Sequence, residues 1–184
     1  MTSIRIPTVL VIGATGAGKT TLLLHMLGRR PPEARWAVLV NDFGDTHLSR
    51  VDPAVTVREV SGCICCSAQV SLRTAFVTLL RQAKPQRLLI EASSAAHPGA
   101  IVKVLREPGL ASSVELERVV CVVDPRQVLD ARYAGNDLYR EQLKAADEIV
   151  MSRSDAVGAS KLDAAIAVLE RFGLTSARVG RVER

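Results

Sequence analysis

This chain has no long apolar run and no block of basic residues, and it has few aromatic residues. No run approaches the roughly 18–20 apolar residues that a membrane-spanning helix needs, so no membrane partner is expected. Aromatic residues make up only 3% of the 184 residues and no basic cluster stands out, which argues against a nucleic-acid-binding surface. The net charge of +5 then indicates a solvated basic exterior together with an anion-binding site.

The chain also has no internal repeat and no low-complexity segment, so its length predicts a single domain over residues 1–184. The first residues, MTSIRIPTVLVI, lead directly into an apolar run and leave no room for a signal peptide. We therefore expect a cytoplasmic protein. In that compartment its four cysteines are expected to be reduced thiols or metal ligands, because disulfides are rare there.

A complete phosphate-binding motif follows the first apolar run, Val9 to Ile12. Residues 13–20 read GATGAGKT and fit the pattern G-x-x-x-x-G-K-[ST], with a strand before them and a helix start after them. The glycines let the backbone turn its N–H groups onto phosphate oxygens. Lys19 supplies a charge for the β- and γ-phosphates, and the Thr20 hydroxyl can ligate Mg²⁺. The residues expected to contact nucleotide are Gly13, Thr15, Gly16, Ala17, Gly18, Lys19, Thr20 and Thr21.

Short apolar runs alternate with segments of helical periodicity along the rest of the chain. This alternation predicts an α/β fold, with a doubly wound, mostly parallel sheet and helices on both faces. Strands are expected at 37–40, 55–60, 88–90, 119–123, 148–151 and 177–182, and helices at 67–82, 99–106, 136–146 and 158–171.

Polar residues stand at or just after the ends of several of these strands. In a doubly wound sheet the ligand binds beyond the carboxyl ends of the strands, so these residues are expected to share one site with the phosphate loop. They are Asn41, Asp42, Glu91, Asp124 and Asp155. Glu91 would face the γ-phosphate through Mg²⁺ or a water molecule. For Asp124, which precedes a proline, capping of a following helix explains the position equally well.

Three of the four cysteines lie within residues 62–66, GCICC. In an extended backbone Cys63 and Cys65 point to one side and Cys66 to the other, so a turn must bring them to one ion. Thiolates favour soft or borderline metals such as Zn²⁺ or Cu⁺, and three sulfurs leave a fourth tetrahedral position open for a partner. A buried strip of reduced cysteines and a redox switch remain as alternatives. Cys121, inside the run VVCVVD, is expected in the core.

In their order and spacing, three motifs resemble the CobW-like branch of the CobW/HypB/UreG GTPases: GATGAGKTTLL, NDFG at residues 41–44 and SGCICCS at residues 61–67. The resemblance continues through EASSAAHP at residues 91–98 and EQLKAADEIVMSRSD at residues 141–155, so it covers almost the whole chain. It implies the P-loop NTPase fold and a metallochaperone that couples GTP hydrolysis to delivery of zinc, cobalt or nickel. GTP or GDP and Mg²⁺ would be its cofactors. A client metalloprotein or cofactor-synthesis enzyme would be its partner, and whether it forms a homodimer stays open.

The resemblance also implies a role for each candidate residue. Lys19 would hold the phosphates, and Thr20 and Glu91 would organise Mg²⁺. Asp42 would sense the γ-phosphate or touch the cargo metal. The cargo ligands would be Cys63, Cys65 and Cys66. Hydrolysis would relax the loops that carry Asp42 and the cysteines, and so change the metal affinity of the cysteines.

Departures from the family pattern bear on this function. Asp42 stands where the family usually has Glu, and the base-reading stretch at residues 152–155 is Ser-Arg-Ser-Asp instead of Asn-Lys-x-Asp. Asp155 can still accept hydrogen bonds from guanine N1–H and N2–H₂, which adenine lacks, and Arg153 can stack on the base. The family usually has a second, carboxyl-terminal domain, which is expected to be missing because the chain ends at Arg184.

Two other functions are consistent with the residues. A nucleotide-responsive metal-binding or sensing module would bind nucleotide but barely hydrolyse it, and the altered base-reading stretch favours this function. An ATP-dependent small-molecule kinase would use the same phosphate loop but has no need for the cysteine cluster. A turnover assay with and without Zn²⁺, together with a nucleotide competition assay, separates the three functions.

Replacing Lys19 with alanine is expected to abolish triphosphate binding, because the loop would lose its fixed cation among the phosphates. A charged hydrogen bond contributes roughly 1.5–3 kcal/mol, before any disturbance of Mg²⁺ geometry. Titration with a GTP analogue measures the loss. An affinity equal to that of the unmodified chain would contradict the assignment of this loop.

Overall fold

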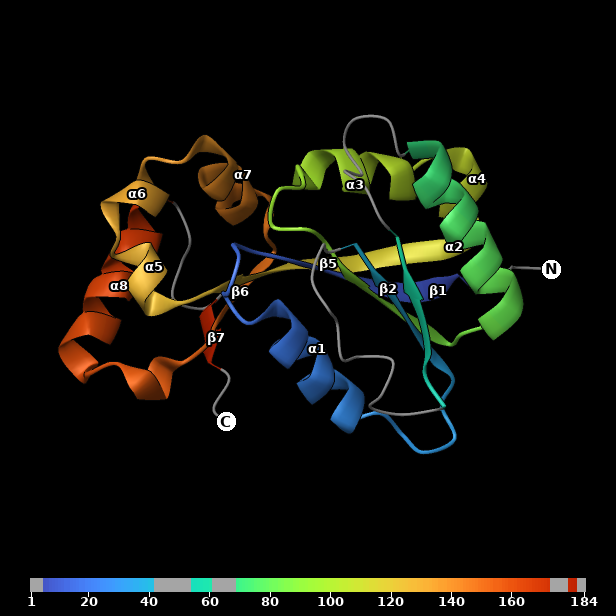
Figure 1. Ribbon diagram of the computed structural model, residues 1–184, viewed down its shortest axis with the longest axis horizontal. Helices are drawn as coiled ribbons and strands as arrows, with labels where there is room; N and C mark the ends of the chain where they lie inside the picture. The colour runs from blue at the N-terminus through green and yellow to red at the C-terminus, as the bar shows by residue number, and fades with distance from the viewer. Residues whose placement is uncertain (1–4, 42–53, 61–68, 173–178, 182–184) are drawn as a thin grey trace.

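The computed structural model of the protein describes residues 5–41, 54–60, 69–172 and 179–181 (Figure 1). The strands are β1 (Ile6–Ile12), β2 (Trp36–Val40), β3 (Thr56–Glu59), β4 (Arg87–Glu91), β5 (Val114–Val123), β6 (Glu148–Met151) and β7 (Val179–Arg181). The helices are α1 (Lys19–Gly28), α2 (Gln69–Ala83), α3 (Pro98–Leu105), α4 (Pro108–Ala111), α5 (Pro125–Val128), α6 (Ala131–Ala134), α7 (Asp137–Ala145) and α8 (Ala159–Arg171), with a 3₁₀ turn at Ser154–Ala156.

One parallel sheet organises the described residues. Its strand order is β3-β2-β4-β1-β5-β6-β7, and every neighbouring pair runs parallel. The chain first builds the sheet from β1 toward β3, and after β4 it continues on the other side toward β7. The direction of winding therefore reverses beside β1. Ligands bind at such a switch point, beyond the carboxyl ends of the strands, and the predicted phosphate loop leaves β1 there.

Alternate residues of the strands enter two hydrophobic layers, one on each face of the sheet. Leu10 and Ile12 of β1 join a cluster that includes residues of α2, α3, α7 and α8. Val9 and Val11 pack on the other face with residues of α1. Because side chains alternate along a strand, a run that is apolar at every position has to be covered on both sides. In Figure 1, α1 lies on one side of the sheet and α2 and α3 on the other, which confirms the predicted doubly wound α/β fold.

The predicted strands and long helices lie close to their expected positions, but β5 is longer than predicted and begins at Val114. Its first half carries charged side chains that hide the strand pattern; Glu117, for example, pairs with Arg87 of β4 at 2.9 Å. The short helices α4 and α6 were not predicted, because four residues are too few to show helical periodicity. The equally short α5 was expected only as the helix that Asp124 could cap. Within the described ranges, no helix is long and apolar enough to cross a membrane.

Cys121 lies in the core, as the sequence predicts. It has 0% exposed surface in β5, and burial raises the pKa of its thiol to about 12. The thiol therefore stays protonated and packs as a small apolar group. The other candidate cysteines, Cys63, Cys65 and Cys66, lie outside the described residues, and so does Asp42.

Gly13 follows β1 at a point where no side chain fits. Its φ is +142°, and an added Cβ would lie 2.4 Å from the backbone oxygen of Val122 in β5. Gly13→Ala is therefore expected to lower the free energy of unfolding by roughly 2–6 kcal/mol, through backbone strain and overpacking together.

Gly16→Ala is the matched control for this variant. Gly16 also has a positive φ, +73°, but apart from its two chain neighbours no atom of the described residues lies within 4 Å of its added Cβ. Strain alone should therefore lower the free energy of unfolding by roughly 1–2 kcal/mol. Thermal unfolding of the two variants measures the difference, at roughly 2–4 °C per kcal/mol for a chain of this size. Equal losses in the two variants would show that the close approach to Val122 has no energetic consequence.

Candidate nucleotide-binding site

The phosphate loop joins the end of β1 to the start of α1. Gly18 occupies the N-cap position of α1 with a left-handed backbone, φ 101° and ψ 23°, and the helix begins at Lys19. Gly16 has a positive φ of 73°, so both glycines adopt a conformation that other residues reach only with strain. The loop thus brings the N–H groups of a helix start to the edge of the sheet where ligands bind.

Lys19 folds back over this loop. The residue is buried, with 5% exposed surface, and its Nζ donates to the backbone oxygens of Gly13 and Ala14 at 3.2 and 3.4 Å. A buried ammonium needs acceptors or an anion around it. The two carbonyls keep the charge on the loop, and phosphate oxygens could replace them as acceptors.

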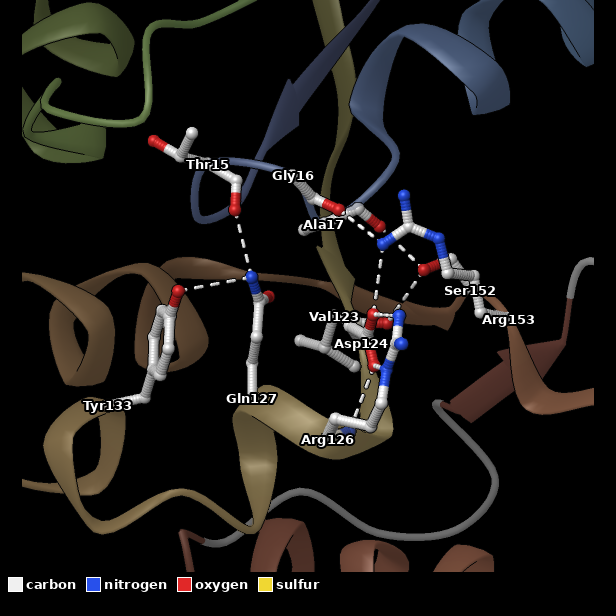
Figure 2. A network of polar contacts seen from close by, with 10 residues as sticks. All are labelled: Thr15, Gly16, Ala17, Val123, Asp124, Arg126, Gln127, Tyr133, Ser152 and Arg153. Carbon is white, nitrogen blue, oxygen red and sulfur yellow. Dashed lines mark hydrogen bonds and ion pairs between the residues drawn. The ribbon is translucent and has the colours of Figure 1, made fainter. Parts of the chain in front are cut away.

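Side chains from two neighbouring strand ends hold the next three carbonyls of the loop, as Figure 2 shows. The pairs are Gln127 Nε2 with Thr15 O at 2.8 Å, Arg153 Nη1 with Gly16 O at 2.7 Å, and Ser152 Oγ with Ala17 O at 2.5 Å. Gln127 lies in α5, just after β5, whereas Ser152 and Arg153 directly follow β6. The loop is therefore fixed from outside by residues far away in the sequence.

These contacts orient the N–H groups of the loop. In a planar trans peptide, the C=O of one residue and the N–H of the next point in opposite directions. Holding the oxygens of Thr15, Gly16 and Ala17 on one side therefore turns the following N–H groups, up to that of Gly18, to the other side. The Ala17 N–H donates to the Ala14 oxygen at 3.2 Å within the loop, so a phosphate oxygen would replace this carbonyl as its acceptor. Consecutive N–H groups arranged in this way form a concave anion-binding nest.

Thr20 and Glu91 meet beside the loop. The Thr20 hydroxyl donates to Glu91 Oε1 at 2.8 Å, and Glu91 is only 1% exposed at the end of β4. Hydroxyl and carboxylate oxygens are the hard ligands that Mg²⁺ prefers. Because the hydroxyl proton points to Glu91, the lone pairs of Thr20 Oγ1 can face a cation. Thr20 would ligate an Mg²⁺ ion here, and Glu91 would orient the Thr20 hydroxyl.

Asp124 holds two arginines at the carboxyl end of β5. Its Oδ1 accepts from the backbone N–H of Arg126 at 2.9 Å, which caps α5 and confirms the capping interpretation. Its Oδ2 accepts from Arg126 Nη2 at 2.6 Å and from Arg153 Nη1 at 3.0 Å. Burial raises the pKa of Asp124, but the hydrogen bonds from Arg126 and Arg153 outweigh burial and lower the pKa to about 2. The stability that this carboxylate contributes is complete above its ordinary pKa of 3.8 and is lost as the pH falls through about 2.

The two candidate base-reading residues lie in the turn after β6. Arg153 has a left-handed backbone with φ 50°, which is uncommon for a residue other than glycine. It leads directly into the 3₁₀ turn that carries Asp155. Asp155 is exposed, so its carboxylate is accessible to a ligand. It lies two residues after Arg153, whose side chain contacts Gly16.

Most of the predicted site residues that the structure describes come together at this edge of the sheet. Thr15, which was expected to contact nucleotide, also donates from its hydroxyl to Ser94 Oγ at 2.7 Å, so the loop contacts the segment after β4. Thr21 is exposed in the first turn of α1. Asn41 Nδ2 donates to the Val60 oxygen at 2.8 Å, so this side chain joins the ends of β2 and β3.

Gln127 is the site residue that sequence reasoning missed. The pair Asp124-Pro125 is a recognisable helix start, because proline is favoured in the first helical turn. That signal places Gln127 in the first turn of a helix after a strand end, where a polar side chain can reach the ligand edge. The signal does not show that this side chain turns toward the phosphate loop. For the part of the chain that the structure describes, no group of three His, Cys, Asp or Glu side chains is placed to hold a metal ion.

Comparison with known proteins identifies the family. Residues 7–174 match the CobW/HypB/UreG nucleotide-binding domain. The chain belongs to this family. One curated relative, the zinc chaperone YeiR of Escherichia coli K12, is 41% identical over 150 residues, which cover 79% of this chain and 46% of YeiR. The chain thus spans about half the length of the curated relatives that it matches.

Two solved structures share the fold of this CobW/HypB/UreG domain. Zn(II)-bound YjiA GTPase from E. coli has a TM-score of 0.68 and 23% identity, covering 98% of this chain and 57% of that chain. HypB from Helicobacter pylori in complex with nickel has a TM-score of 0.61 and 14% identity, covering 96% of this chain and 77% of that chain. The family match confirms the resemblance predicted from the motifs, and the structural likeness confirms the fold.

In this CobW/HypB/UreG domain, Glu91→Gln is expected to reduce the gain in triphosphate affinity that Mg²⁺ gives. Glutamine keeps the size of the side chain but removes the charge, so roughly 1.5–3 kcal/mol of the Mg²⁺-dependent part should be lost, a factor of about 10 to 150. Titration with a GTP analogue in Mg²⁺ and in EDTA measures that part.

Glu117→Gln is the control, because Glu117 lies in the exposed first half of β5 and pairs with Arg87. It should keep the full Mg²⁺ dependence. If Glu91→Gln kept it too, the assignment of Glu91 to the Mg²⁺ site would be wrong.

Proposed function

We propose that the chain is the GTP-binding and GTP-hydrolysing domain of a metallochaperone, which binds a thiophilic divalent metal and delivers it to a client protein or cofactor pathway. The observation that carries this proposal is the Thr20–Glu91 hydrogen bond of 2.8 Å. It lies beside a phosphate loop in which three successive carbonyls accept from side chains outside the loop. This chain, a member of the CobW/HypB/UreG family, also carries the sequence GCICC at residues 62–66.

The phosphates would enter the nest that the loop forms. Backbone N–H groups and the helix start favour the negative charge. Lys19 would exchange its carbonyl acceptors, now 3.2 and 3.4 Å from Nζ, for β- and γ-phosphate oxygens. Mg²⁺, when bound by Thr20 with Glu91 behind it, supplies positive charge to the phosphate oxygens. We expect slow intrinsic turnover, because such sites often depend on an arginine brought by a partner.

Guanine would be read in the turn after β6. The exposed Asp155 carboxylate can accept both N1–H and N2–H₂ of guanine. A site built around such a pair discriminates strongly against a ligand that lacks the matching donors. Ser152 and Arg153 support this proposal, because they hold the turn against the phosphate loop despite the departure from Asn-Lys.

The cargo metal would bind to Cys63, Cys65 and Cys66, with zinc as the first candidate and cobalt or nickel as alternatives. Thiolates in this number suit Zn²⁺ and leave one tetrahedral position for a client's ligand. The names of the relatives support a metal of this class, since YeiR is a zinc chaperone, and the structures of YjiA and HypB contain zinc and nickel. Asp42, just after β2, would respond to the γ-phosphate or contact the cargo.

Zinc affinity is expected to depend on the bound nucleotide. Competition against a zinc chelator dye, without nucleotide, with GDP and with a non-hydrolysable GTP analogue, measures the dependence. A typical coupling of about 1–3 kcal/mol would appear as a 5- to 150-fold change. Because coupling is reciprocal, zinc must change the affinity for the GTP analogue by the same factor.

The double variant Cys65→Ser with Cys66→Ser should lose the tight zinc site and keep its GTP affinity in metal-free buffer. Cys121→Ala is the control, because this buried thiol lies in the core, and its zinc titration should match that of the unmodified chain.

Three superimposable titration curves from the unmodified chain, without nucleotide, with GDP and with the GTP analogue, would rule out the coupled mechanism. They would leave a nucleotide-binding domain with an independent metal site, and a turnover assay would then decide whether it hydrolyses GTP at all.

A further inference from the structure

We infer that Asp124 is a positioning residue of the nucleotide site, whose carboxylate fixes the Arg153 guanidinium against the phosphate loop and so sets the preference of the Asp155 turn for guanine. This inference rests on the proposed guanine-nucleotide function. Asp124 would not touch the nucleotide; it would act through Arg153. Figure 2 shows the chain of contacts that connects Asp124, Arg153 and Gly16.

A single nitrogen of Arg153 makes both of the hydrogen bonds that connect Asp124 with the phosphate loop. Nη1 donates to the Gly16 oxygen at 2.7 Å and to Asp124 Oδ2 at 3.0 Å. A planar guanidinium held by two acceptors at one nitrogen cannot swing away from the loop without breaking a charge-assisted hydrogen bond. The Asp124 side chain is 3% exposed and that of Arg153 is 37% exposed, so the anchor is buried while part of the arginine remains accessible.

A second aspartate in the same segment shows that the contact with Arg153 is not needed for helix capping. Asp130 caps α6 as Asp124 caps α5, accepting from the Arg132 N–H at 2.9 Å and from Arg132 Nη2 at 2.6 Å. Its side chain is 26% exposed. The Asp-x-Arg cap is therefore complete without any further contact. Asp124 differs from Asp130 by deep burial and by a second arginine, Arg153, which reaches the phosphate loop.

The backbone of Arg153 links this anchor to base recognition. Its left-handed φ of 50° lies directly before the turn that carries Asp155. Such a conformation persists only where the surroundings hold it, and it is common at functional sites. Since Asp155 is two residues from Arg153, a guanidinium fixed to the phosphate loop also fixes the place of the Asp155 carboxylate relative to bound phosphates. Guanine selectivity should therefore depend on Asp124.

The test measures the ratio of the affinities for GDP and ADP, both with Mg²⁺, on the full chain. Removing the Asp124 charge changes the electrostatic attraction for the phosphates of both nucleotides alike, so this effect cancels in the ratio. Asp124→Asn keeps the cap, because asparagine serves as well as aspartate at that position. It should lower the preference for GDP about tenfold, the equivalent of one charged hydrogen bond. Asp130→Asn, the matched control, should leave the ratio unchanged.

Arg153→Met tests the route through the arginine. Methionine keeps the aliphatic stem and loses both contacts of Nη1, so it should lower the ratio as much as Asp124→Asn does. The double variant should show no further loss, because two changes in one pathway are not additive. A further loss in the double variant would mean that Asp124 acts by another route and would overturn the inference.

The outcomes also separate this inference from the proposed function. An unmodified chain that binds GDP and ADP equally would overturn both. A clear GDP preference that Asp155→Ala removes and Asp124→Asn leaves intact would overturn only the role of Asp124. If Asp124→Asn did not fold, Arg153→Met alone would decide, and an unchanged ratio in that variant would overturn the inference.

Discussion

The carbonyl groups of the phosphate loop have to point away from the phosphate, and the rest of the site depends on how the fold enforces this. A short glycine-rich loop has many backbone states, and ordering them opposes binding by roughly 1–2 kcal/mol per residue. Here the side chains of Gln127, Arg153 and Ser152 hold three successive carbonyls of the loop. A loop that is already ordered leaves more of the interaction energy for affinity.

The parallel sheet makes this arrangement possible. The strands β5 and β6 lie on one side of β1, and their carboxyl ends carry the three donors. On the other side of β1, β4 ends at Glu91, which accepts from Thr20 at 2.8 Å. The loop is therefore supported from one side by donors to its carbonyls, and on the other side Thr20 is paired with a buried carboxylate. Both depend on the switch in winding beside β1.

The sequence predicts the parts of the site that are local. The phosphate motif, the alternation of strands and helices and the carboxylate at the end of β4 all depend on short patterns, and each is found where it was expected. Asp124 was open between a ligand role and a helix cap, and it caps α5. Its contact with Arg153, 29 positions further along the chain, could not be read from a pattern, because it requires β5 and β6 to be neighbours.

The sequence pattern gave no usable signal for Gln127 and a misleading one for the start of β5. Gln127 lies in a helix of four residues, too short for periodicity. The charges in the first half of β5 concealed its start, because they pair across the sheet instead of facing a core. The roles of Asp42 and of the cysteine cluster remain predictions, since these residues lie outside the described ranges. Features formed by residues close together in the sequence could thus be predicted, whereas contacts between distant residues could not, whatever the residue types.

The central claim is that Gln127, Arg153 and Ser152 hold the phosphate loop in the shape that binds phosphate. A crystal structure of the chain with GDP and Mg²⁺ tests it most directly. The account predicts that the oxygens of Thr15, Gly16 and Ala17 keep their present donors, and that Lys19 Nζ leaves the Gly13 and Ala14 oxygens for phosphate. A loop that releases these donors and takes up a different backbone path around the phosphates would contradict the account.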